Sequence, residues 1–241
     1  MKCHNSALTM TDLETRLQSI TQALQAAAHK HGRPMPLLLA VSKKHPADTI
    51  EALYKWGQRA FGESYLQEAL QKQLALAHLA IEWHFIGPIQ SNKTREIANH
   101  FSWVHSIDRL KIARRLNDQL MTDKAPLNVC IQVNIDNERS KAGVTPEEVI
   151  PLCKEIIAMP NLALRGLMCI PQKRTEPEHQ RIAFAALGRL LSNLKTAFAT
   201  SHPEQASQLD TLSMGMSNDY EAAIAEGSTI VRIGTALFGE R

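Results

Sequence analysis

Short apolar runs alternate along the chain with longer segments in which apolar residues recur at helical spacing. The first longer segment has Leu13, Leu17, Ile20 and Leu24 at intervals of four, three and four residues. This spacing predicts an amphipathic helix over about residues 11–31. A glycine and a proline follow within a few residues, as is typical of a helix end.

Eight apolar runs of strand length come after this helix, with helix-like segments between them. Strands that alternate with helices predict right-handed crossovers and a parallel sheet. Eight parallel strands close most naturally into a (β/α)8 barrel. We therefore expect a single α/β domain of the TIM-barrel type over residues 1–241, with the barrel at about 36–241. The runs lie at residues 36–41, 60–61, 83–86, 103–107, 129–135, 164–168, 211–214 and 230–233.

The two ends of the chain fit this architecture together. Only a few residues follow the eighth run, so the last helix of a regular barrel is missing, and the N-terminal helix is expected to take its place. The alternative is an open, doubly wound sheet. The first run lacks the G-x-G-x-x-G turn of dinucleotide-binding sheets, and its absence favours the barrel.

Composition and charge narrow the function classes. The chain is 44% hydrophobic and 21% charged, and its 27 Lys and Arg against 24 Asp and Glu give a net charge of +3. Because the basic residues are scattered, nothing indicates a nucleic-acid or membrane surface. The N-terminus turns polar before a signal-peptide core could form, and no apolar stretch reaches membrane length. We expect a soluble, cytoplasmic protein.

The cysteines and histidines do not suggest metal chemistry. Cys3, Cys130, Cys153 and Cys169 lack C-x-x-C spacing, and two of them lie in apolar strand-like runs, which favours reduced, buried thiols. The ten histidines include no H-E-x-x-H motif, so no catalytic metal is expected.

Lys43 is the first candidate for chemistry, because active sites of such barrels lie at the carboxyl ends of the strands. It ends an apolar run, where burial would lower the pKa of its ammonium group. A lysine that loses its proton is a nucleophile that forms a Schiff base with an aldehyde. The alternative is that Lys43 and its neighbour Lys44 simply extend to solvent.

A second signal follows the last two strands, where barrels commonly hold phosphate. Ser217 precedes a helix-like stretch over 218–226 and is expected at its N-cap, where free backbone N–H groups suit an anion. Gly234 permits close approach of the backbone, and Thr235 adds a hydroxyl group. Alternatively, Ser217 only caps its helix and Gly234 only makes a turn.

Arg232 lies inside an otherwise apolar strand. A permanently charged guanidinium group there needs a partner, which is either an acidic side chain or an acceptor on a ligand. His84 and His105 also lie in strands and are expected to be core histidines rather than bases. An aldehyde-capturing lysine, a phosphate site and an arginine between them together describe a pocket for pyridoxal 5'-phosphate (PLP).

Six segments along nearly the whole chain carry a family resemblance. They are LAVSK at 39–43, FGESY at 61–65, HFIGPIQSNK at 84–93, LRGLM at 164–168, LSMGMSND at 212–219 and VRIGTALFG at 231–239. In this order they resemble the YggS/PROSC family of pyridoxal phosphate homeostasis proteins, which look like the N-terminal barrel domain of alanine racemase standing alone.

The resemblance implies a role for each candidate residue. Lys43 would carry PLP as a Schiff base, and Arg232 would face the pyridine nitrogen. Because arginine stays protonated, the pyridine nitrogen would stay unprotonated and the ring would be a poorer electron sink. The other implied contacts are phosphate contacts from Ser217, Gly234 and Thr235, and further cofactor contacts from Met214 and from Ser64, where the family usually has asparagine.

The implied function is PLP binding for intracellular vitamin B6 homeostasis, without settled catalytic activity. One alternative is a PLP-dependent amino-acid racemase, although this chain has no residues left for the second racemase domain. Another is a barrel enzyme acting on a phosphosugar without a Schiff base. Apo PLP-dependent enzymes are expected acceptors, with Lys141 as a second amine that assists release. A closed barrel leaves no sheet edge to pair, so a monomer is expected.

Overall fold

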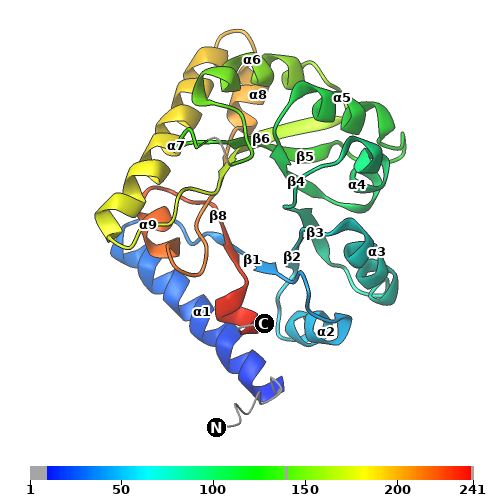
Figure 1. Cartoon of the computed structure of the whole chain (residues 1–241), viewed down its shortest axis with the longest axis vertical. Helices are drawn as coiled ribbons and strands as arrows, with labels where there is room; N and C mark the ends of the chain where they lie inside the picture. The colour runs from blue at the N-terminus through cyan, green and yellow to red at the C-terminus, as the bar shows by residue number, and fades with distance from the viewer. Residues whose placement is uncertain (1–9, 139–140, 240–241) are drawn as a thin grey trace.

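The computed structural model describes residues 10–138 and 141–239, in which eight parallel strands form a closed barrel (Figure 1). Neighbours in sequence pair throughout, and β8 closes the barrel by pairing with β1. All eight predicted strands are present, with some ends shifted by one or two residues. They are β1 (Leu37–Val41), β2 (Ala60–Glu63), β3 (Glu82–Phe85), β4 (Trp103–Ile107), β5 (Leu127–Val133), β6 (Leu162–Cys169), β7 (Thr211–Ser213) and β8 (Ile230–Ile233).

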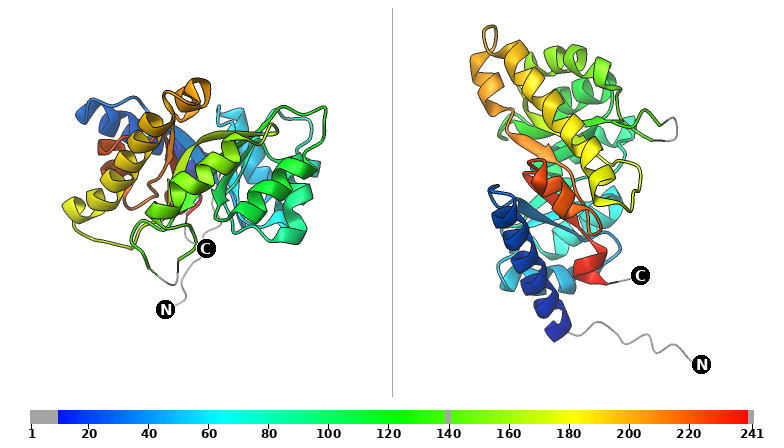
Figure 2. Two further views of the ribbon diagram at one scale, coloured as in Figure 1. Left: turned by 90° about the horizontal axis from the view of Figure 1, so that it is seen from above. Right: turned by 90° about the vertical axis from the view of Figure 1, so that its left-hand side faces the viewer.

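Helices surround the barrel and cover the outer faces of the strands (Figures 1 and 2). No helix among the described residues is long and apolar enough to cross a membrane. The capping box at Thr145 and Glu148, with proline at the first helical position, starts α6 as the sequence indicates. The helices are α1 (Met10–Lys30), α2 (Ala47–Lys55), α3 (Leu66–Ala75), η1 (Ser91–Lys93), α4 (Thr94–His100), α5 (Leu110–Gln119), α6 (Pro146–Ile157), α7 (Pro177–Phe198), α8 (Pro203–Gln208), α9 (Tyr220–Ala225) and α10 (Thr235–Phe238).

The N-terminal helix lies where a regular barrel has the helix that follows its eighth strand. Among the described residues after β8, α10 is a helix of four residues, and α1 packs against α2, α9 and α10, as the right-hand view of Figure 2 shows. Lys30 at the end of α1 pairs with Glu221 of α9 at 2.7 Å. The expectation that α1 completes the helical layer is confirmed.

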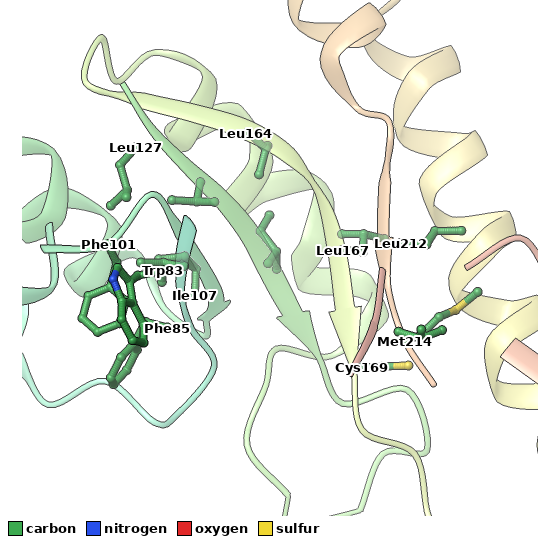
Figure 3. Packing of buried hydrophobic residues seen from close by; sticks show 14 of the residues in the cluster. Trp83, Phe85, Phe101, Ile107, Leu127, Leu164, Leu167, Cys169, Leu212 and Met214 are labelled. Carbon is green, nitrogen blue, oxygen red and sulfur yellow. The ribbon is translucent and has the colours of Figure 1, made fainter. Parts of the chain in front are cut away.

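The main hydrophobic core lies between the strands and the helices. Figure 3 shows part of it, where Trp83, Phe85 and Phe101 gather on one side and Leu167, Leu212 and Met214 on another. The barrel interior differs, because it carries the buried polar side chains of His84, His105, Ser213 and Arg232 beside smaller apolar clusters. The outward faces of the strands therefore hold the barrel together, while part of its interior is polar.

Candidate functional site

A cavity of about 680 Å³ opens at the carboxyl ends of the strands. Most of its walls come from the segments that follow β1, β2, β3, β5, β6, β7 and β8. Six of the seven predicted site residues line it: Lys43, Ser64, Ser217, Arg232, Gly234 and Thr235. The fold thus brings together residues that are almost two hundred positions apart in the chain.

The backbone on both sides of Lys43 is held by a buried ionic cluster. Nζ of Lys72 donates to the carbonyl oxygen of Ser42 at 2.8 Å and to Oε1 of Glu63 at 2.7 Å. The Ser42 hydroxyl donates to the same Glu63 oxygen at 2.6 Å, and the Lys44 N–H donates to Glu68, which also pairs with Lys72. Lys43 itself is half-buried, so the cluster fixes the segment from which its amine enters the cavity.

The unfavourable part of this arrangement is the burial of the Glu63 carboxylate. Its side chain is fully buried, and its second oxygen, Oε2, has no hydrogen-bond partner among the described residues. Burial raises the pKa of Glu63, and the hydrogen bonds from Lys72 and Ser42 oppose that rise. The sequence places Glu63 at the end of a strand, but the reach of Lys72 from α3 back to β1 has no signal in the sequence.

Ser64 is placed by a close approach of two chain segments. A Cβ atom at Gly87, which follows β3, would lie 2.2 Å from the Ser64 carbonyl oxygen, so only glycine fits there. The Ser106 hydroxyl donates to the Gly87 carbonyl oxygen at 2.6 Å and holds the same loop. Ser64 is half-buried at the cavity wall.

The segment after β7 differs from the sequence-based expectation for Ser217. Helix α9 begins at Tyr220, and Asp219, not Ser217, occupies the N-cap position. Residues 217–219 form a turn in which the Asp219 N–H donates to the Met216 carbonyl oxygen at 3.1 Å, and Oδ1 of Asp219 accepts a further hydrogen bond from the Met216 N–H at 2.6 Å. The prediction that Ser217 caps this helix was wrong. Its hydroxyl instead accepts a hydrogen bond of 3.3 Å from the Ala236 N–H in α10.

Gly234 leaves space that no protein atom fills. Its φ of −113° lies outside the left-handed region that favours glycine, and a Cβ atom there would come no closer than 3.5 Å to Val41. The packing of the protein therefore does not require glycine at this position. Since Gly234 lines the cavity beside Ser217 and Thr235, the missing side chain widens the part of the cavity that was expected to hold phosphate.

Arg232 is almost entirely buried and forms no salt bridge with a carboxylate among the described residues, although it attracts Asp219 electrostatically. Its Nη1 donates to the carbonyl and hydroxyl oxygens of Ser213, and its Nη2 donates to the Cys169 carbonyl oxygen. Burial lowers the pKa of the guanidinium group, which nevertheless stays protonated. Nε–H and one Nη2 hydrogen have no acceptor among the described residues, so Arg232 can still donate to an acceptor in the cavity.

Met214 is the one predicted site residue that does not line the cavity. Its side chain is fully buried in the main hydrophobic core, and Figure 3 shows it beside Leu212 on the face of β7 toward the helices. Alternation along a strand explains this, since the preceding residue, Ser213, points into the barrel. Contact of Met214 with a cofactor stays a prediction.

The buried polar and sulfur-containing residues follow the expectations from the sequence. His84 and His105 are fully buried in the barrel. Cys130, Cys153 and Cys169 are free and buried, and burial raises the pKa of each thiol to about 12. Cys3 lies outside the described residues.

Basic side chains surround the mouth of the cavity. Lys141 and Lys173 are exposed, and Arg174 pairs with Asp136 at 2.6 Å. Lys141, Lys173 and Arg174 all line the cavity, from the loops after β5 and β6. Lys173 and Arg174 were not singled out in the sequence, although their position just after a strand was a usable signal.

Comparisons with known proteins agree with this geometry. Residues 15–241 match the model of the family described as alanine racemase, N-terminal domain. The chain is 52% identical over 234 residues to the pyridoxal phosphate homeostasis protein of Pseudomonas aeruginosa, covering 96% of this chain and 97% of that one. It is 46% identical over 237 residues to the protein of the same name from Escherichia coli K12, covering 96% and 98%.

Solved structures share the fold. PipY of Synechococcus elongatus, solved with and without PLP, is 34% identical, with TM-scores of 0.80 and 0.82 and coverage of 94% of this chain and all of that chain. Alanine racemase of Corynebacterium glutamicum is 19% identical with a TM-score of 0.67, and 60% of its length is covered, so it shows the fold alone. The chain belongs to the alanine racemase N-terminal domain family and, within it, to the pyridoxal phosphate homeostasis proteins.

Proposed function

We propose that this protein binds PLP as a Schiff base on Lys43 and takes part in intracellular PLP homeostasis. The observation that carries the proposal is the set of groups that border one cavity. They are the half-buried Lys43, the hydroxyl groups of Ser217 and Thr235 beside Gly234, and the buried Arg232 with its spare N–H groups. The relatives named as PLP homeostasis proteins and the PLP-bound PipY structure support it.

The three functional groups of PLP match three parts of the cavity. The aldehyde suits the primary amine of Lys43, which forms an imine and releases water. The phosphate suits Ser217 and Thr235, where Gly234 leaves room. The pyridine nitrogen is an acceptor, and Arg232 has N–H groups that lack a protein acceptor among the described residues. The donors present therefore fit the cofactor.

The chain's own residues restrict what the bound cofactor can do. PLP supplies an electron sink for amino-acid chemistry, and its strength depends on protonation of the pyridine nitrogen. Because Arg232 does not give up its proton, it would donate to that nitrogen and leave it neutral. Electron withdrawal is then weak, which favours a protein that holds the cofactor over one that transaminates.

Delivery of PLP to another protein requires that its covalent bond to Lys43 be broken. Lys141 is exposed at the mouth of the same cavity, and with PLP bound its amine would displace the amine of Lys43, which would leave as a free amine and release PLP from the deeper site. We propose that the protein does this as a cytoplasmic monomer. In the Lys141→Ala variant PLP should load normally and transfer more slowly to an apo-enzyme, and an unchanged transfer rate would exclude this role.

A matched pair of lysine variants tests the cofactor site. Lys43→Arg and Lys44→Arg both keep the positive charge and both remove a primary amine. With PLP added, the wild type and Lys44→Arg should show the visible band of a Schiff base, and Lys43→Arg should not. Equal bands in all three would contradict the assignment of Lys43.

The alternative of an amino-acid racemase gives a different result in the same variants. Exchange of the α-proton of amino acids in deuterated water reports racemase chemistry directly. We expect no turnover by the wild type beyond that of free PLP. Turnover that disappears in Lys43→Arg would replace the carrier by an enzyme, and a colourless wild type would point to a phosphosugar enzyme that uses the same phosphate site.

A further inference from the structure

A continuous chain of hydrogen bonds crosses the barrel interior and ends at Arg232. Nη1 of Arg232 donates to the Ser213 hydroxyl at 2.8 Å. That hydroxyl lies 2.7 Å from Nδ1 of His105, and Nε2 of His105 lies 2.9 Å from Nδ1 of His84. Nε2 of His84 lies 2.6 Å from Oε1 of Glu82. Four strands contribute to this chain, which none of the proposed cofactor contacts explains.

The groups at the two ends of this hydrogen-bond chain determine which atom donates and which accepts in each of its bonds. Arginine only donates, so Ser213 accepts from Arg232 and its own proton is available for an accepting Nδ1 of His105. At the other end, the hydrogen bond from His84 lowers the pKa of Glu82 and keeps it ionised, so Nε2 of His84 must donate. Burial lowers the pKa of both histidines, so each ring is neutral, with its proton on Nε2 and an accepting Nδ1. No bond in the chain has two donors or two acceptors.

The middle of this hydrogen-bond chain is shielded from solvent, whereas Glu82 at one end is partly exposed and Arg232 at the other end lines the cavity. The side chains of His84, His105 and Ser213 are fully buried. Trp103 stacks on His84 with 5.5 Å between ring centroids and 3° between the ring planes. Glu82 is the first residue of β3, and its side chain is 46% exposed. The chain thus runs from solvent at the amino ends of the strands to the cavity at their carboxyl ends.

Arg232 cannot pass its proton along this chain, because guanidinium does not deprotonate in proteins. The chain therefore holds Arg232 and does not conduct protons. We propose that Ser213, His105 and His84 are positioning residues that fix the plane of the Arg232 guanidinium group toward the pyridine nitrogen of PLP, with Glu82 as the anionic end of the chain. The positioning of Arg232 toward PLP rests on the proposed function, whereas the hydrogen-bond chain is present in the structure without the cofactor.

Nitrogen NMR of the histidines tests the chain in cofactor-free protein. At about pH 7, the ring nitrogens of His84 and His105 should show neutral rings with the proton on Nε2. Glu82→Leu removes the terminal acceptor and should shift the signals of both rings, while Glu51→Leu, at a half-buried carboxylate of α2 outside the hydrogen-bond chain, should shift neither. A proton on Nδ1 of either ring, or unchanged NMR signals of His105 in Glu82→Leu, would contradict the proposed hydrogen-bond chain.

Cofactor binding tests the positioning role. Ser213→Ala removes the hydroxyl group between Arg232 and His105 with little loss of volume, and we expect PLP to bind about tenfold more weakly, as for loss of a hydrogen bond to a charged group. Its visible band should also move. Ser213→Thr keeps the hydroxyl and should restore both, and Met168→Leu, a buried residue of the barrel interior outside the chain, should change neither.

These measurements separate the inference from the function on which it rests. If wild-type protein does not bind PLP, the proposed function fails, while the NMR result still decides whether the chain exists. If wild type and Ser213→Ala bind PLP equally and show the same band, the positioning role is wrong although PLP binding stands. His105→Phe breaks the chain at a second point, and binding as tight as in the wild type would overturn the role in the same way.

Discussion

Nζ of Lys72 lies 2.7 Å from Oε1 of Glu63 in an ion pair whose side chains are 7% and 0% exposed. Both residues also bind the segment that carries Lys43, through the carbonyl and hydroxyl groups of Ser42. A buried pair of this kind costs much to desolvate, and its loss on one side leaves an uncompensated charge. The position of the candidate cofactor lysine is thereby coupled to the stability of the barrel.

Replacement of Lys72 should therefore be strongly destabilising. Lys72→Met keeps most of the side-chain volume but leaves Glu63 without its cation, and we expect a loss of about 3–5 kcal/mol in the free energy of unfolding. Urea unfolding measures this change. Lys55→Met removes the exposed partner of Glu51 and should leave the midpoint nearly unchanged. Equal midpoints for the two variants would contradict the account of the buried pair.

Gly234→Ala should separate ligand binding from folding. Because a Cβ atom there makes only ordinary contacts with Val41, the variant should unfold at nearly the same urea concentration as the wild type. The added methyl group occupies space in the cavity, so PLP should bind about tenfold or more weakly, which corresponds to 1.4 kcal/mol. Equilibrium dialysis measures the affinity. Wild-type affinity in Gly234→Ala would show that the phosphate does not lie at this position.

Stability should fall as the pH drops below the ordinary range of histidine. Burial lowers the pKa of His84 and lowers that of His105 well below the ordinary value of 6.5. Their contribution to stability is complete above about pH 6.5, the pKa in the unfolded chain, and is lost as the pH falls toward the lowered values of the folded state. Each unit of lowering corresponds to about 1.4 kcal/mol.

Urea unfolding at several pH values checks this dependence. The wild type should lose stability between about pH 6.5 and pH 5. A variant with both His84→Gln and His105→Gln starts less stable, but it should lose less over the same interval because these two groups no longer titrate. An identical slope in the two proteins would assign the pH dependence to other groups.

The thiols at Cys130, Cys153 and Cys169 should resist modification in the folded protein. With a pKa of about 12 and full burial, they contain very little thiolate at pH 8. In a Cys3→Ser background, Ellman's reagent should label no thiol in native protein and three in denaturant. Rapid labelling of the native protein would show that the barrel opens more readily than its packing indicates.

The architecture was predictable because it depends on periodicity. Eight apolar runs separated by helical segments indicate a barrel, and the short segment after the last run indicates that α1 completes the helical layer. Lys43, Arg232 and Gly234 were identifiable because each is an unusual residue at or near the end of a strand. For these residues the local sequence indicates both where the residue lies in the fold and which chemistry it can perform.

The remaining features depend on contacts between distant segments. The hydrogen-bond chain from Arg232 to Glu82 requires side chains of β3, β4, β7 and β8 to meet inside the barrel. The salt bridge of Lys72 requires the packing of α3 against the end of β1. The helix boundary near Ser217 depends on the local bond between Asp219 and Met216. For Met214, alternation with Ser213 was an available signal that favoured the core.

The most direct test of the account is to trap the bond between the protein and PLP. Borohydride reduction makes a Schiff base permanent, and peptide mass mapping then identifies the modified lysine. We predict a yellow protein in which the reduced PLP adduct lies on Lys43 alone. A colourless protein, or adducts spread over exposed lysines such as Lys44 and Lys173 with none on Lys43, would contradict the proposed cofactor site.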